Sequence, residues 1–89
     1  MAPNSSFARP LDCIEMGRRG RIQRIDWSVL DAAESSRLKH FGFDEGVLVE
    51  PLHSGLFGRG PMAVKVGRMT VAIRRTHARA IQVIPANQG

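Results

Sequence analysis

The sequence is poor in several residue types, and each shortage argues against a class of protein. Cys13 is the one cysteine among 89 residues, so no internal disulfide can form, which fits a reducing compartment. Tyrosine is absent, and one tryptophan with four phenylalanines leaves few rings for stacking on nucleic-acid bases. No apolar run reaches the roughly 18 residues of a membrane span, and residues 1–10 lack the apolar segment of a secretory signal. We therefore expect a cytoplasmic protein.

Motifs for catalysis and for metal binding are also missing. The sequence has no Walker loop, no dinucleotide fingerprint and no spacing typical of a Ser-His-Asp triad or of paired catalytic carboxylates. Side chains that could bind iron or zinc are scattered, without Cys-x-x-Cys or His-x-x-x-His spacing: Cys13, His40, His53, His77, Asp44 and Glu45. We expect no enzyme, no cofactor and no dedicated metal site.

The net charge is +5, from 13 Lys and Arg against 8 Asp and Glu. Such an excess attracts anionic partners, which include RNA, an acidic protein face and anionic lipid headgroups. Charge alone does not choose between them, and a basic surface without a dedicated polyanion partner fits equally well.

The clearest structural signal is a β-hairpin over residues 61–74. Two alternating runs flank Gly67-Arg68, and glycine at the first central position suits a two-residue type II′ turn. This turn pairs Val66 with Met69 and places six apolar side chains on one face: Met62, Val64, Val66, Met69, Val71 and Ile73. Lys65, Thr70, Ala63 and Ala72 then lie on the other face.

A helix is expected before this hairpin, over residues 31–41. Asp31 followed by Glu34 is typical of a capping box, and Gly42 suits the left-handed position that ends a helix. The expected core-facing stripe consists of Leu30, Ala33, Leu38 and Phe41.

Three further strands and a 3₁₀ turn complete the pattern. Residues 20–27 form a strand with a bulge, because Ile22 and Ile25 are out of phase. Residues 46–53 form a second strand that Pro51 makes irregular. A single 3₁₀ turn over residues 75–80 precedes the last strand, residues 81–83. About five strands with one inserted helix predict a mainly β, small SH3-like barrel over residues 11–84, with tails at 1–10 and 85–89.

Four stretches of this barrel resemble the FeoA family of small ferrous iron transport proteins. They are Leu11-x-x-Ile14-x-x-Gly17-x-x-Gly20-x-Ile22, Arg37-Leu38-x-x-Phe41-Gly42-Phe43-x-x-Gly46, the segment 55–66 around Pro61, and Ile73-Arg74-x-x-x-Ala78-x-x-Ile81-x-Val83. The resemblance implies a non-enzymatic cytoplasmic adaptor that supports ferrous iron uptake by binding the membrane transporter FeoB. The fold also occurs as a trailing domain of metal-dependent repressors, so a metal-responsive regulatory domain is an alternative.

Two surfaces are candidates for partner binding. The first comprises Leu56 and Phe57, which either anchor a partner or plug the barrel, together with Lys65 and Arg74 beside the smooth Ala63/Ala72 face. The second is a run of arginines, Arg18, Arg19, Arg21 and Arg24, which resembles the RNA-contacting turn of some ribosomal SH3-like barrels. The alternative for this run is a solvated strand edge kept soluble by its charge.

Overall fold

The computed structural model describes residues 7–54 and 60–86, and within them the chain forms one antiparallel sheet. The strand order is β1-β6-β2-β3-β4-β5. The strands are β1 (Arg9–Pro10), β2 (Gly20–Ile25), β3 (Leu48–Ser54), β4 (Met62–Val66), β5 (Met69–Ile73) and β6 (Ile81–Pro85). The helices are α1 (Ala32–Phe41) and α2 (Arg75–Arg79), and the 3₁₀ turns are η2 (Leu11–Cys13) and η3 (Trp27–Val29).

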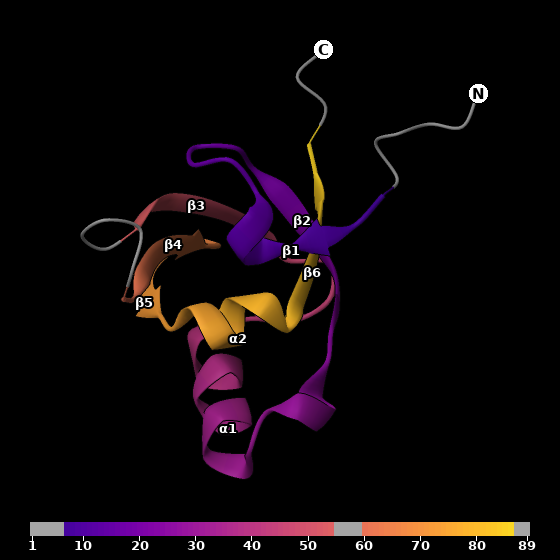
Figure 1. The fold of residues 1–89 in the computed structure, drawn as a ribbon, viewed down its shortest axis with the longest axis vertical. Helices are drawn as coiled ribbons and strands as arrows, with labels where there is room; N and C mark the ends of the chain where they lie inside the picture. The colour runs from indigo at the N-terminus through magenta and orange to yellow at the C-terminus, as the bar shows by residue number, and fades with distance from the viewer. Residues whose placement is uncertain (1–6, 55–59, 87–89) are drawn as a thin grey trace.

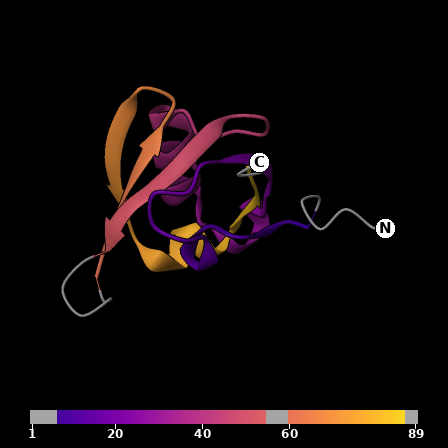
Figure 2. The same cartoon turned by 90° about the horizontal axis from the view of Figure 1, so that it is seen from above.

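The sheet curls around one apolar core, as an SH3-like barrel requires. In Figure 1 α2 crosses the open side of the curled sheet between β5 and β6, and α1 projects below the barrel. Seen from above, β3 runs across the molecule beside the hairpin of β4 and β5 (Figure 2). The mainly β, SH3-like fold predicted from the sequence is confirmed.

The predicted hairpin forms with the predicted register. Val66 pairs with Met69, and the pairing continues without a shift to Met62 and Ile73. Gly67 has φ 58°, a left-handed value that favours glycine. Five of the six apolar side chains are buried, but Met69 is 51% exposed. Met69 lies beside the turn, at the end of β5 that is farthest from the buried Ile73.

Both predicted strand irregularities are present. The register of β2 against β6 shifts between Ile22 and Arg24, and this bulge allows Ile22 and Ile25 both to be buried. The register of β3 against β4 shifts between Pro51 and His53. Pro51 itself is buried, and its carbonyl accepts a 2.6 Å hydrogen bond from the N–H of Gly17.

Helix α1 begins and ends as predicted. The N–H of Glu34 donates to the Asp31 carboxylate at 2.8 Å, and the N–H of Asp31 donates to the Glu34 carboxylate at 2.9 Å. Gly42 has φ 98°, and the N–H of Phe43 donates to the carbonyl of Leu38, which completes a Schellman ending.

The predicted apolar stripe of α1 is wrong at one position. Leu38 is buried, while Leu30 and Phe41 pack partly buried against the core. Ala33 is exposed. Figure 1 shows α1 projecting below the barrel, and the helix residues that contact the core, Leu38 and Phe41, belong to its C-terminal half.

Three other predictions need correction. Arg9 and Pro10, predicted in a tail, form β1 and pair with Val83 and Gln82. Pro85, also predicted in a tail, is buried in β6 opposite Gly20. The predicted 3₁₀ turn is the α-helix α2. A pairing of two residues needs only backbone groups, so it leaves no side-chain pattern in the sequence.

The largest fully buried side chains come from all parts of this fold, including Leu11 of η2, Phe43 after α1, Met62 of β4 and Ile81 of β6. Within the described residues, no helix combines the length and the apolar character that crossing a membrane requires.

Candidate partner-binding surface

The outer face of the β3–β4–β5 sheet carries Lys65. This exposed side chain lies on β4 between Glu50 of β3 and Thr70 of β5. A hollow of about 180 Å³ beside it is lined by Arg19, Leu48, Val49, Glu50, Lys65 and Gly67. Leu48 is 46% exposed there, and the Arg19 Nε lies 3.6 Å from a Glu50 carboxylate oxygen. The hollow thus combines an exposed apolar side chain with charges of both signs.

A groove between α1 and the hairpin carries Arg74. Its volume is about 210 Å³, and its lining consists of Arg37, Leu38, Phe41, Pro61, Ala72, Ile73, Arg74 and His77. The Arg37 guanidinium lies 5.9 Å from the centre of the Phe41 ring. Lys65 on β4 and Arg74 at the start of α2 therefore line different hollows. Leu56 and Phe57, the other predicted contacts, lie outside the described residues.

One end of this groove holds a buried histidine and a carboxylate. The Nε2 of His77 lies 3.0 Å from the Glu34 carboxylate, and the His77 side chain is 10% exposed. The Asp31 N–H, followed by the His77 hydrogen bond, holds the pKa of Glu34 below its usual value. The sequence identifies Glu34 as a capping residue and His77 as a scattered histidine. No sequence signal joins them, because 43 residues separate them.

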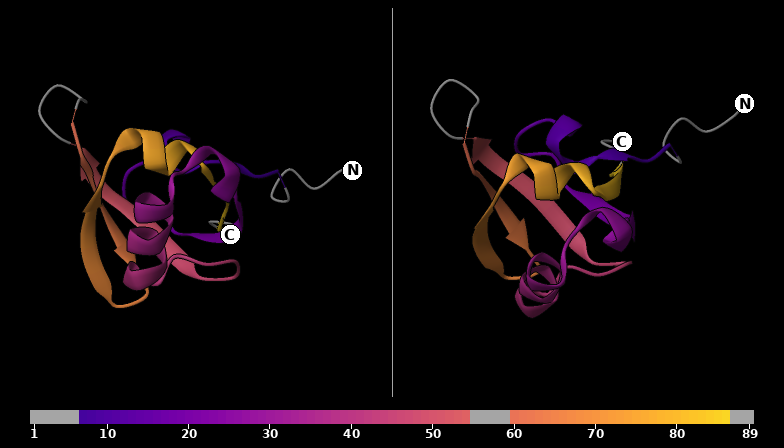
Figure 3. Two further views of the ribbon diagram at one scale, coloured as in Figure 1. Left: turned by 90° about the horizontal axis from the view of Figure 1, so that it is seen from below. Right: turned by 60° about the horizontal axis from the view of Figure 1, so that its bottom comes forward.

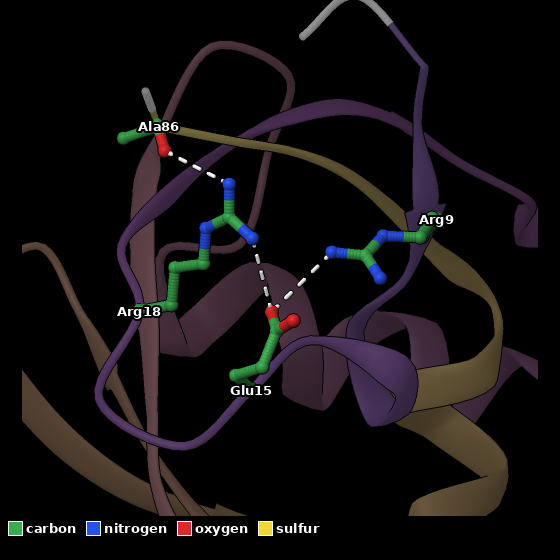
Figure 4. A network of polar contacts seen from close by, with 4 residues as sticks. All are labelled: Arg9, Glu15, Arg18 and Ala86. Atoms are coloured by element: carbon green, nitrogen blue, oxygen red, sulfur yellow. Dashed lines mark hydrogen bonds and ion pairs between the residues drawn. The ribbon is translucent and has the colours of Figure 1, made fainter. Parts of the chain in front are cut away.

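Arg18, the first of the predicted arginine run, has intramolecular partners (Figure 4). Its guanidinium donates to Glu15 at 3.2 Å and to the carbonyl of Ala86 at 3.3 Å. Arg9 approaches the same Glu15 oxygen at 3.3 Å. A backbone hydrogen bond, then the Arg18 hydrogen bond, lowers the pKa of Glu15. This network connects the segment before β2 with both chain ends of the described fold.

The other three arginines of the run, Arg19, Arg21 and Arg24, lie on separate surfaces of the barrel. Arg21 donates to the carbonyl of Gly46 at 2.7 Å, and Arg19 lies beside Glu50. Arg24 lines a separate wide hollow of about 670 Å³ between β2, β6 and α2, together with Arg79 and Asp26. The four arginines therefore do not form one continuous basic patch.

The predicted metal-binding candidates do not converge. Cys13, His40, His53, Asp44 and Glu45 are exposed on separate elements and turns, and His77 contacts Glu34. In residues 7–54 and 60–86, no three His, Cys, Asp or Glu side chains gather closely enough to hold a metal ion.

A family model described as the FeoA domain matches residues 9–85. The chain belongs to the FeoA domain family. This match extends across every strand of the barrel, from β1 to β6. Curated proteins give no match to this FeoA domain.

Solved structures share its fold. A FeoA-like protein from Clostridium acetobutylicum superposes with a TM-score of 0.77 at 15% identity, covering 94% of this chain and 93% of that one. The FeoA of Stenotrophomonas maltophilia was solved as a zinc complex and is named a prokaryotic SH3 domain protein. It superposes with a TM-score of 0.67 at 25% identity, covering 82% of this chain and 86% of that one. A manganese-dependent transcriptional repressor superposes with a TM-score of 0.74 at 23% identity. The superposition covers 89% of this chain and 42% of the repressor.

Proposed function

We propose that this FeoA domain is a non-enzymatic cytoplasmic adaptor that supports ferrous iron uptake by binding and modulating the cytoplasmic part of a FeoB-type transporter. The observation that carries the proposal is the family match over residues 9–85, which includes the whole described barrel. The Stenotrophomonas maltophilia relative is itself named as a candidate ferrous iron transport activating factor. A small barrel with exposed loops and sheet faces is suited to binding another protein.

The contact surface that we propose combines charged and apolar side chains. Lys65 and Arg74 are exposed on the sheet and at the start of α2. Leu56 and Phe57 are proposed as apolar anchors from the sequence, because two large apolar residues in a glycine-rich segment suit insertion into a partner's pocket. Exposed basic residues would steer the approach to an acidic partner, and the apolar anchors would supply most of the affinity.

RNA binding is the alternative that the arginine run suggested. The contacts of Arg18, Arg19 and Arg21 support the adaptor instead, because Arg18 and Arg21 already donate hydrogen bonds within the fold and Arg19 pairs with Glu50. A phosphate contact would have to compete with these acceptors. The division of the run over separate surfaces also lowers the number of phosphates that one strand can reach at once.

A pull-down against the transporter's cytoplasmic domain, with and without guanine nucleotide, tests the adaptor function. We expect retention by the wild-type chain at physiological salt and a loss of about tenfold or more in Leu56→Asp or Phe57→Asp, as is typical of an interface anchor. The matched control is the combined variant Arg19→Gln, Arg21→Gln and Arg24→Gln, which should be retained like wild type. Arg18 is left intact there because its guanidinium bonds to two partners, Glu15 and Ala86.

Thermal melting of each variant separates a binding defect from unfolding. A folded Leu56→Asp variant with undiminished retention would remove that residue from the interface. A wild-type chain that is not retained under any nucleotide condition would refute the adaptor proposal.

A further inference from the structure

The two edges of the sheet differ in how well they are protected. Natural sheets block edge strands with short length, proline, charge or a bulge, because an open edge pairs with other chains. At one edge β1 has only two residues, Arg9 and Pro10. At the other edge β5 has five residues, Met69–Ile73, with no proline, no charge and an unbroken register against β4. Among the described strands, β5 is the edge without these protections.

The free side of β5 presents backbone groups at two positions. In a two-residue hairpin the pair that closes the turn, here Val66 and Met69, is hydrogen-bonded, and bonded pairs alternate with non-bonded ones from there. Thr70 and Ala72 occupy non-bonded positions, so their N–H and C=O groups point away from β4. Both residues are exposed, and neither makes a backbone hydrogen bond to another loop or element in the described chain.

The groove beside α1 borders this edge. Ala72 and Ile73 of β5 form one wall, and Leu38 and Phe41 of α1 form the other. Figure 3 shows α1, α2 and the hairpin from the side on which α1 projects. An edge strand beside a groove that has apolar side chains in its walls is an arrangement in which an added strand gains backbone hydrogen bonds and side-chain contacts together.

The charges around the groove are mainly positive. Arg37 and Arg74 line it, and Arg68 lies in the hairpin turn next to β5. Among the residues that the structure describes, the lining of the groove includes no acidic residue; Glu34 lines the adjoining hollow and already accepts hydrogen bonds from Asp31 and His77. A segment entering here would find arginines available for its carboxylates.

We propose that the free edge of β5 and the groove beside α1 bind an extended, acidic segment of a partner protein, which adds to the sheet as a further strand. Its alternate residues would contact the apolar wall of Phe41 and Ile73, and its acidic residues would face Arg37 and Arg74. A second copy of this chain is disfavoured as the occupant, because two such edges would bring their arginines together. The inference rests on the proposed function for the identity of its partner, the transporter's cytoplasmic part.

A model peptide tests the edge without the transporter. The probe is a blocked octapeptide of alternating valine and aspartate, titrated into the isotope-labelled full chain, and the control peptide has lysine in place of aspartate. We expect the largest NMR amide shifts at Thr70 and Ala72, and affinity at least about tenfold higher for the aspartate peptide. Shifts confined to the hollow around Arg24 and Arg79 would overturn the proposal.

Two variants separate backbone pairing from charge. Ala72→Pro removes an outward N–H that β4 does not use, so it should leave the hairpin folded and reduce peptide affinity about tenfold. The double variant Arg37→Glu, Arg74→Glu tests the charges if the proline variant melts early. Arg24→Glu, a charge reversal at a separate hollow, is its control. Equal peptide binding by the double variant and the control would overturn the proposal.

The same variants distinguish this inference from the proposed function. If the transporter domain is retained equally by wild type, by folded Ala72→Pro and by the double variant, the edge proposal fails and the adaptor function stands. If the peptide binds at β5 but the wild-type chain retains no transporter domain, the adaptor function fails and the edge site stands. Sedimentation tests whether a second copy occupies the edge instead. If the wild-type chain is a dimer and Ala72→Pro is a monomer, the edge binds a second copy of this chain, and the proposal of an acidic partner segment is overturned.

Discussion

Individual side chains on β4 show how one residue step separates core from surface. Val64 is fully buried between the paired residues Pro51 and Val71, whereas the next residue, Lys65, is exposed. We expect Val64→Lys to unfold the domain, because it buries an unpaired ammonium in the core. Lys65→Val should change the free energy of unfolding by about 0.5 kcal/mol or less. Circular dichroism melting of both variants checks this, and equal stability would show the face assignment to be wrong.

The end of α1 depends on one left-handed backbone conformation. Gly42 has φ 98°, and no heavy atom outside its neighbours lies within 4 Å of the position where a Cβ would stand. Any cost of substitution there is therefore conformational. We expect Gly42→Val to destabilise the fold by about 1–2 kcal/mol, and Gly42→Asn to cost less, because asparagine tolerates the left-handed region. Urea unfolding compares the two variants, and equal midpoints would argue against this mechanism.

The junction of α1 with α2 makes stability depend on pH. The pKa of Glu34 is lowered from 4.5 by the Asp31 N–H and by His77. A depressed carboxyl pKa contributes stability above the unfolded value, and this contribution is lost as the pH falls through the folded pKa. Glu34→Gln keeps an acceptor for Asp31 but removes the charge. We expect the variant to be less stable at neutral pH and to lose less stability between pH 7 and pH 3.

Thermal melting across that pH range measures this difference. His40, an exposed histidine on the same helix, supplies the control variant His40→Gln, which should follow the wild-type pH dependence. A Glu34→Gln curve parallel to that of wild type would show that the carboxylate makes no net contribution to folding.

At the scale of the whole molecule, the charge of +5 is spread over separate surfaces rather than gathered in one patch. We expect weak RNA binding at physiological salt, with a shallow dependence of affinity on salt, because few phosphates can be contacted at once. Neutralising Arg19, Arg21 and Arg24 should change this retention little. Filter binding at several salt concentrations provides the measurement. Tight binding at physiological salt that disappears with these arginines would favour the RNA alternative.

The SH3-like barrel itself could be predicted because its signals are local. The hairpin register follows from alternation around Gly67-Arg68, and the ends of α1 follow from Asp31, Glu34 and Gly42. The bulge in β2 follows from the phase of Ile22 and Ile25. Each of these features depends on residues within a few positions of one another, so the sequence alone determines them.

The candidate binding surface depended on the tertiary structure. Only folding brings His77 to Glu34, separates Arg24 from Arg18, and leaves Met69 exposed beside the turn. The pairing of β1 with β6 and the open edge of β5 follow from strand order, which no local pattern encodes. Backbone hydrogen bonds are alike for every residue type, and contacts between distant segments depend on how the elements pack. The sequence therefore determined the hairpin, α1 and the bulge in β2, while the packing of all the elements decided which surfaces remain free to bind a partner.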